Sequence, residues 1–135
     1  MNKKTIFALS SPQGKSAVAI IRISGPSAYK IVGSISSNMP KKPGIVSLNK
    51  IYDKKKSVID QTITTYFKAP KSFTGEDVVE ITVHGGSAVI KKTLGVLSSF
   101  KETRLAEPGE FTRRAFENNK LDLTQVEAIA DVVDS

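Results

Sequence analysis

The residues from Ser72 to Gly86, SFTGEDVVEITVHGG, constrain the fold of this chain more than any other stretch. Ser72, Thr74 and Gly75 favour a turn, because Gly75 permits backbone angles that other residues resist. Five of the six residues in Val78–Val83 are β-branched, which predicts a strand. A glycine pair ends this strand just before a segment with helical spacing. Such a layout is typical of a ligand-facing corner.

The predicted strand has two different faces, because side chains alternate along a strand. One face carries only the apolar side chains of Val79, Ile81 and Val83. The other face carries Val78, Thr82 and the carboxylate of Glu80. An unpaired buried charge would be costly. Glu80 is therefore expected to bind a ligand, to form a salt bridge, or to lie in an edge strand.

Composition limits the possible chemistry. A length of 135 residues predicts one domain, and the absence of cysteine excludes disulfides and thiolate metal sites. His84 is the only histidine, which excludes a multi-histidine metal site. No apolar run is long enough to predict a membrane span. The net charge of +7 favours encounter with polyanions, but it is spread along the chain, and Lys54–Lys56 is typical of a solvated loop.

Further strands and helices are predicted around the central strand. Arg22 lies in an apolar run typical of a strand buried on both faces, so its guanidinium must meet an anion or carbonyl groups, or extend to solvent at the strand end. Gly95 weakens a predicted helix, which indicates close packing there. The expected strands are Thr5–Leu9, Ala17–Ile23, Ile45–Tyr52 and Val58–Phe67, and the expected helices begin near Pro26 and span Ser87–Phe100.

Pro108 and Gly109 introduce a further short helix, with Glu110 in its first turn. Its spacing predicts that three residues pack inward and that two arginines face away. The packed residues are Phe111, Ala115 and Phe116, and the arginines are Arg113 and Arg114.

A last helix is predicted from a capping box at Thr124–Glu127. Its apolar face and its lack of a stop signal indicate that the chain is part of a longer protein, and that Thr124–Ser135 is loosely held. Amides of the tail are expected to exchange hydrogen faster than those of Val78–Val83. The apolar face consists of Val126, Ile129, Ala130 and Val133.

Three blocks of this sequence resemble one known family. They are IFALSSPQGKSAVAIIRISGPSA, SFTGEDVVEITVHGG and RLAEPGEFTRRAFENNKLDLTQVEAIAD. Together they are similar to the N-terminal region of the MnmE/TrmE family of tRNA modification GTPases, over nearly the whole chain. Asn118-Asn119 and Lys15 depart from the usual residues of the family, which could alter loop shape.

The resemblance implies an α/β (α+β) domain with a mixed sheet and flanking helices, similar to the tetrahydrofolate-binding fold of aminomethyltransferases. It implies a folate-binding and dimerisation domain over residues 1–119 and the start of a helical domain over 120–135. The implied ligand is 5-formyl-tetrahydrofolate, a one-carbon donor, and the implied partners are a second copy and the flavoprotein MnmG (GidA). The complete cytoplasmic protein would modify the wobble uridine of tRNA and bind GTP, Mg and K ions in a separate GTPase domain. This chain has no P-loop sequence, so GTP hydrolysis is not assigned to its residues.

The same resemblance places the folate-binding residues at Arg22, Glu80 and Lys120. A carboxylate such as Glu80 can accept the paired N–H groups of a pterin, and cations such as Arg22 or Lys120 can bind the carboxylates of a folate tail. Two alternatives stay open: a basic RNA-binding module, and a purely structural dimerisation domain. Against the first, no stripe of aromatic and basic residues is visible in the sequence.

Overall fold

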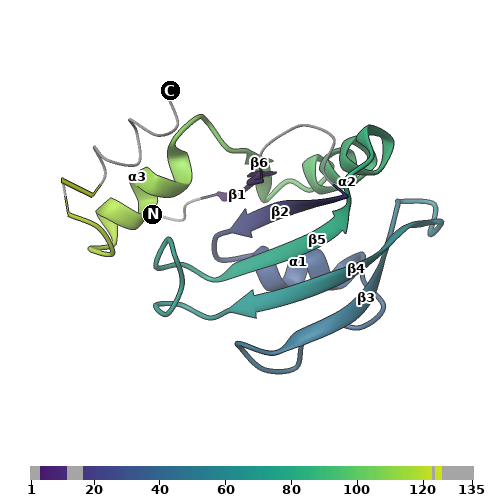
Figure 1. The fold of residues 1–135 in the computed structure, drawn as a ribbon, viewed down its shortest axis with the longest axis horizontal. Coiled ribbons are helices and arrows are strands. Elements are labelled where there is room, and N and C mark those ends of the chain that lie inside the picture. Colours follow the sequence, from purple (N-terminus) through teal and green to yellow (C-terminus); the bar gives the residue numbers. More distant parts are fainter. Residues whose placement is uncertain (1–3, 12–16, 123, 126–135) are drawn as a thin grey trace.

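The structure is a computed structural model, and it describes residues 4–11, 17–122 and 124–125. Within these ranges six strands form one sheet in the order β3-β4-β5-β2-β1-β6, and three helices accompany it (Figure 1). The elements are β1 (Thr5–Leu9), β2 (Val18–Ser24), α1 (Ala28–Ser34), β3 (Val46–Tyr52), β4 (Val58–Phe67), β5 (Val78–His84), α2 (Ser87–Ser98), β6 (Thr103–Leu105) and α3 (Glu110–Glu117).

The sheet is mixed, which confirms the expected fold class. Its neighbouring strands run antiparallel except β1 and β6, which are parallel. The central strand predicted from the valine-rich run is β5, which pairs with β4 on one side and β2 on the other. In the β2–β5 register Arg22 lies directly opposite Glu80, so the pairing of two strands brings two candidate site residues together.

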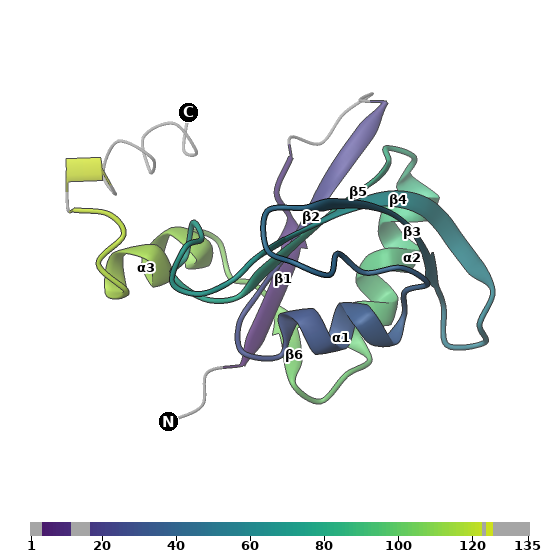
Figure 2. The same ribbon diagram turned by 90° about the horizontal axis from the view of Figure 1, so that it is seen from below.

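Helices α1 and α2 lie on the same side of the sheet (Figure 2). The β-branched residues expected on one face of β5 are buried there, with exposed fractions of 0–1% for Val79, Ile81 and Val83. Burying such side chains from water is the main source of stability for a domain of this size. The helical side of the core also includes Ile21, Ile23, Ala28, Ile31, Val32, Ile51, Val96 and Leu97.

The opposite face of the sheet is open, which corrects the prediction for β2. Val18 is 51% exposed and Ile20 half-buried, whereas Ile21 is fully buried. The apolar run of β2 therefore does not mean burial on both faces. The open face continues onto the edge strand, where Leu48 is 66% exposed and lies opposite Ile63, which is 44% exposed.

The prediction for the sides of α3 is confirmed for buried Ala115 and exposed Arg113, and it is wrong for two residues. Arg114 is 3% exposed, although the spacing predicted that it would face away, and Phe116 is 43% exposed, although it was expected to pack. The reason is that α3 packs against the polar turn before β5, where the largely buried carboxylate of Glu76 requires a cation. β6 was not predicted, since three residues are too few to show a period.

The remaining elements refine three expectations. A Cβ added to Gly95 would meet no other atom within 4 Å, so close packing does not explain this glycine. Asp122 and Gln125 form a reciprocal capping box, in which each side chain accepts the other's backbone N–H at 2.8 Å. This box begins two residues before the predicted one. The predicted helical face of Val126, Ile129, Ala130 and Val133 lies outside the described residues.

Candidate functional site

A hollow of about 460 Å³ lies on the open side of the sheet, near the start of α3. Strands β1 and β2 supply one part of its wall, the turn before β5 supplies a second, and the segment that enters α3 supplies the third. Among the described residues that line it, Arg22 is the only cation. The lining consists of Ala8, Leu9, Ser10, Arg22, Phe73, Ala106, Glu107, Pro108, Gly109, Phe111 and Thr112.

Arg22 and Glu80 form an ion pair beside this hollow. The Nε–H of Arg22 donates to Oε2 of Glu80 at 2.9 Å, and the two side chains are 23% and 25% exposed. Among the described residues, no further partner is found for the terminal amino groups of Arg22 or for Oε1 of Glu80. The pair is therefore half-satisfied, and it retains donors and an acceptor for another molecule. Arg22 lines the hollow, whereas Glu80 does not.

Two aromatic rings hold the guanidinium of Arg22. Its central carbon lies 5.1 Å from the ring centroid of Phe73 and 5.4 Å from that of Phe111, within the range of a cation–π interaction. Phe73 is 40% exposed, although large aromatic side chains usually avoid water. The hollow thus combines apolar ring faces with a cation, which suits a flat, partly anionic ligand.

Lys120 lies in a different hollow from Arg22. It is exposed, and it lines a hollow of about 710 Å³ together with Phe116, Asn119, Leu121 and others that follow α3. The stem of Lys120 packs close to Gly75, since a Cβ added to Gly75 would lie 3.4 Å from Cγ of Lys120. The structure thus joins Arg22 to Glu80 directly, and it joins Lys120 to them only through the turn that carries Phe73 and Gly75.

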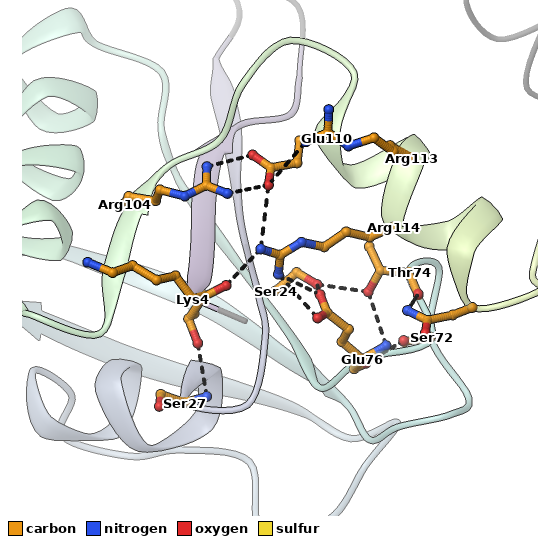
Figure 3. A network of polar contacts seen from close by, with 12 residues as sticks. Lys4, Ser24, Ser27, Ser72, Thr74, Glu76, Arg104, Glu110, Arg113 and Arg114 are labelled. Atoms are coloured by element: carbon orange, nitrogen blue, oxygen red, sulfur yellow. Dashed lines mark hydrogen bonds and ion pairs between the residues drawn. The ribbon is translucent and has the colours of Figure 1, made fainter. Parts of the chain in front are cut away.

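A buried polar network fixes this turn (Figure 3). Ser24 donates to Glu76 at 2.8 Å and contacts the hydroxyl of Thr74 at 2.8 Å. Arg114 of α3 donates from one amino group to both carboxylate oxygens of Glu76, at 3.0 and 3.1 Å. Its other amino group donates to the backbone carbonyl of Lys4 at 2.8 Å. The network therefore ties β2, α3 and the start of β1 to the turn that forms one wall of the hollow.

The same network extends to Glu110 at the first turn of α3. Glu110 is 2% exposed and accepts two hydrogen bonds from Arg104 and one from the backbone of Glu107. The hydrogen bond from Arg104 lowers the pKa of Glu110 to about 2, against the opposing effect of burial. The same contact raises the pKa of Arg104. Glu110 is therefore ionised at neutral pH, where it also faces Arg114 at 3.5 Å.

Sequence reasoning missed the roles of Glu76, Arg104 and Arg114. Glu76 and Arg114 are 38 positions apart, and helical spacing alone assigned Arg114 to the solvent. A usable signal was the pair of acids in the turn, Glu76 and Asp77, beside a strand whose inner face is entirely apolar. Acids in such a place require a cation from elsewhere in the chain.

The corner after β5 does not belong to this hollow. His84 extends from the other end of β5, and its Nδ1 lies 2.8 Å from Oδ1 of Asp60, whose other oxygen accepts the backbone N–H of His84 at 2.7 Å. No cluster of three or more metal-binding side chains is present in the part of the chain that the structure describes. Nor does any helix within the described ranges have the length and apolar character needed to cross a bilayer.

Comparison with known proteins identifies the family. Residues 5–120 match the family model described as the N-terminus of the GTP-binding protein TrmE. The chain is 50% identical over 131 residues to the tRNA modification GTPase MnmE of Roseobacter denitrificans, a match that covers 97% of this chain and 30% of that protein. It is 52% identical over 132 residues to MnmE of Wolbachia sp. subsp. Brugia malayi, covering 98% and 29%.

A eukaryotic relative matches equally well. The chain is 50% identical over 134 residues to the mitochondrial tRNA modification GTPase mss1 of Schizosaccharomyces pombe, covering 97% of this chain and 27% of that protein. The chain thus spans less than a third of the length of these curated relatives. By these matches it belongs to the family of the TrmE N-terminal domain, which occurs in tRNA modification GTPases.

Proposed function

We propose that this chain is a folate-binding domain that holds 5-formyl-tetrahydrofolate in the hollow beside Arg22. The observation that carries the proposal is a half-satisfied ion pair, Arg22 with Glu80, in which the guanidinium contacts two aromatic rings and lines a hollow of about 460 Å³. When bound, the folate would supply a one-carbon unit for chemistry completed elsewhere in a longer protein.

The chemistry of the lining fits a folate. A pterin is flat and partly apolar, so Phe73 and Phe111 can cover its faces. Its ring N–H and amino group need an acceptor, and Oε1 of Glu80 is available for one of them. The glutamate tail carries carboxylates, for which the amino groups of Arg22 and the ammonium of Lys120 are suitable partners.

The proposed domain limits follow from the same assignment. Residues 1–119 would form the folate-binding and dimerisation domain, and 120–135 would begin a helical domain. Lys120 stands at this junction, and its backbone N–H donates to the carbonyl of Ala115 at 2.8 Å, which ties it to the end of α3. A cation at the junction would let the second domain influence the folate site.

We also propose that two copies associate through the open face of the sheet. Val46, Leu48 and Ile63 are 57%, 66% and 44% exposed and lie on adjacent strands, so pairing with another copy would remove apolar surface from water. Sedimentation over a concentration series is expected to show a dimer. Leu48→Lys should shift it to monomer, while Lys50→Ala on the same strand should not. A dimer unaffected by Leu48→Lys would rule out this face.

In the longer protein, we propose the role of the relatives. It would modify the wobble uridine of tRNA with the flavoprotein MnmG (GidA), in the cytoplasm, and would bind GTP with Mg and K ions outside this chain. The curated relatives carry the name tRNA modification GTPase, which supports tRNA modification and GTPase activity, while the wobble uridine, MnmG and the ions are implied by the family resemblance.

Calorimetric titration with 5-formyl-tetrahydrofolate tests the folate assignment. The parent chain is expected to give saturable heat of binding. Glu80→Gln should lose this heat, and Glu102→Gln should keep it, because Glu102 is exposed and lies outside the lining of the hollow. No heat with a folded parent chain would favour the purely structural dimeriser. Heat that survives in Glu80→Gln would place the ligand elsewhere.

A further inference from the structure

The cations of this protein divide into two groups. Each of the four arginines forms an ion pair: Arg22 with Glu80, Arg104 and Arg113 with Glu110, and Arg114 with Glu76. None of these pairs involves a lysine. Each arginine therefore has an acidic partner within the chain, and the excess positive charge of the chain resides on its lysines.

Four of these lysines lie in two neighbouring loops. The backbone N–H of Gly44 donates to the carbonyl of Tyr66 at 2.8 Å, so the loop before β3 lies beside the loop after β4. They share a hollow of about 510 Å³ at the end of the sheet where the turn before β5 also lies. All four lysines are exposed. The hollow is lined by Pro43, Gly44, Phe67, Lys68, Ala69, Pro70 and Lys71, and the other two lysines, Lys41 and Lys42, directly precede it.

No acid within the two loops offsets this charge. Residues 38–52 and 61–75 contain no aspartate or glutamate. Asp77 accepts the backbone N–H of Ala69 at 2.8 Å, so one carboxylate lies beside the loop after β4, and it offsets only part of the charge of four lysines. Lysines near an edge strand also discourage pairing with other chains, and Lys50 on β3 fits that role. Protection of an edge strand does not account for the lysines of the two loops that form this hollow.

The hollow itself has an apolar wall. Phe67 is half-buried and stands with two prolines and a glycine between the lysines. An acidic protein surface would need only the lysines and would leave this wall unused. A strand of RNA uses both, because its bases stack on aromatic rings while its phosphates bind cations. Unpaired bases are needed for stacking, so a single strand fits better than a duplex.

We propose that this hollow, with Phe67 at its wall and Lys41, Lys42, Lys68 and Lys71 around it, binds a single-stranded segment of RNA. This site is separate from the folate hollow, and the proposal does not rest on folate binding. The two hollows share one segment, 68–77, because Phe73 lines one and Lys68 and Lys71 line the other. RNA bound here would therefore lie next to the turn that forms a wall of the folate hollow.

The test uses fluorescence anisotropy with a labelled single-stranded RNA oligonucleotide and two matched double variants. Lys68→Ala with Lys71→Ala should weaken binding about tenfold and reduce the salt slope by about 1.4, the value for two phosphate contacts on a single strand. Lys91→Ala with Lys92→Ala removes the same charge from exposed positions on α2 and should change affinity less than about twofold. Phe67→Leu, which keeps an apolar side chain, should weaken RNA binding at least about fivefold through lost stacking.

Competition with polyglutamate and with duplex RNA completes the test. Single-stranded RNA should bind more tightly than either, and Phe67→Leu should leave polyglutamate binding unchanged. Equal losses of RNA affinity in the two double variants would show that RNA is attracted by the overall positive charge, and would contradict a specific site at this hollow. Tighter binding of polyglutamate would assign the surface to an acidic protein partner instead. Thermal unfolding of each variant confirms that the compared chains are folded.

Discussion

Arg114 and Arg22 each meet a glutamate across a strand or turn, yet their surroundings differ. The Arg114 side chain is 4% exposed, and both of its amino groups are used, by Glu76, by Glu110 and by the carbonyl of Lys4. The Arg22 side chain is 23% exposed and binds Glu80 through Nε alone. The hydrogen bonds of the Arg114 amino groups are supplied by the fold, whereas the terminal amino groups of Arg22 have no partner among the described residues and lie beside a hollow.

This contrast separates a fully satisfied ion pair from a half-satisfied one in one small protein. A buried ion pair requires all its hydrogen bonds, because each unmet group carries a large desolvation penalty. No buried side-chain polar atom among the described residues lacks a partner, which is consistent with that rule. A pair that stays partly open to solvent tolerates unmet groups, since water satisfies them until a ligand arrives.

The largest effect is expected for Arg114→Ala. It leaves the largely buried carboxylate of Glu76 without a cation, while Glu110 keeps Arg104, so the free energy of unfolding should fall by about 3–5 kcal/mol. Arg113→Ala, one position away, is the matched control: its side chain is 54% exposed and its loss should cost less than about 1 kcal/mol. Urea denaturation measures both. Similar values for the two would remove the distinction between buried and exposed arginines.

Glu80→Gln is next and acts on binding. It replaces an acceptor oxygen by an amide that faces the N–H groups of a pterin, so affinity for 5-formyl-tetrahydrofolate should fall by roughly 2–4 kcal/mol. The free energy of unfolding should change by less than about 1 kcal/mol, because the carboxylate is a quarter exposed. A change in stability larger than the change in affinity would make Glu80 a structural residue.

The pH dependence of stability reports on Glu110. The pKa of its carboxyl is about 2 in the folded chain, below the ordinary value of 4.5, so ionised Glu110 stabilises the fold above that ordinary value. This contribution is lost as the pH falls from 4.5 towards 2. It should amount to about 2–3 kcal/mol, discounted because Arg104 is partly exposed.

Acid titration of stability in Glu110→Gln checks this value, with Glu107→Gln as the control on the same segment. Glu107 is 66% exposed, so its variant should keep the acid sensitivity of the parent chain. An unchanged acid transition in Glu110→Gln would place the sensitive carboxylate elsewhere in the network.

Arg22→Ala should produce the smallest change in stability, about 1 kcal/mol or less, since its ion pair and ring contacts are partly exposed. Folate affinity should fall far more. A loss of stability comparable to that of Arg114→Ala would mean that Arg22 supports the fold, and the contrast between the two arginines would no longer hold.

The parts of the fold that repeat with a period were predictable. β-branched runs identified β1, β4 and β5, and apolar spacing identified α1 and α2. Burial was harder to predict, because Val18 and Ile20 are apolar residues yet lie on the open face of the sheet. A local pattern cannot say whether a second layer covers a sheet.

The candidate site was predictable residue by residue but not as an arrangement. Arg22 and Glu80 were each expected to need a partner, and strand register makes them partners of each other. Phe73 carried no sequence signal, and Phe111 was expected only to pack inward, since the contact of both rings with Arg22 depends on the approach of a turn and a helix. Arg114 was misassigned because helical spacing treats every charged side chain as an outward one.

Gly75 shows how a residue without a side chain can govern the surroundings of two hollows. Its φ is +82°, and a Cβ at this position would lie 2.7 Å from Cβ of Asn118 and 3.4 Å from Cγ of Lys120. Both the backbone conformation and the lack of space therefore exclude other residues. In terms of tolerance to mutation, position 75 would be among the least replaceable in the chain, although it binds nothing. Any larger residue would move the turn with Phe73 away from the end of α3, and would alter the surroundings of Arg22 and Lys120 in a single step.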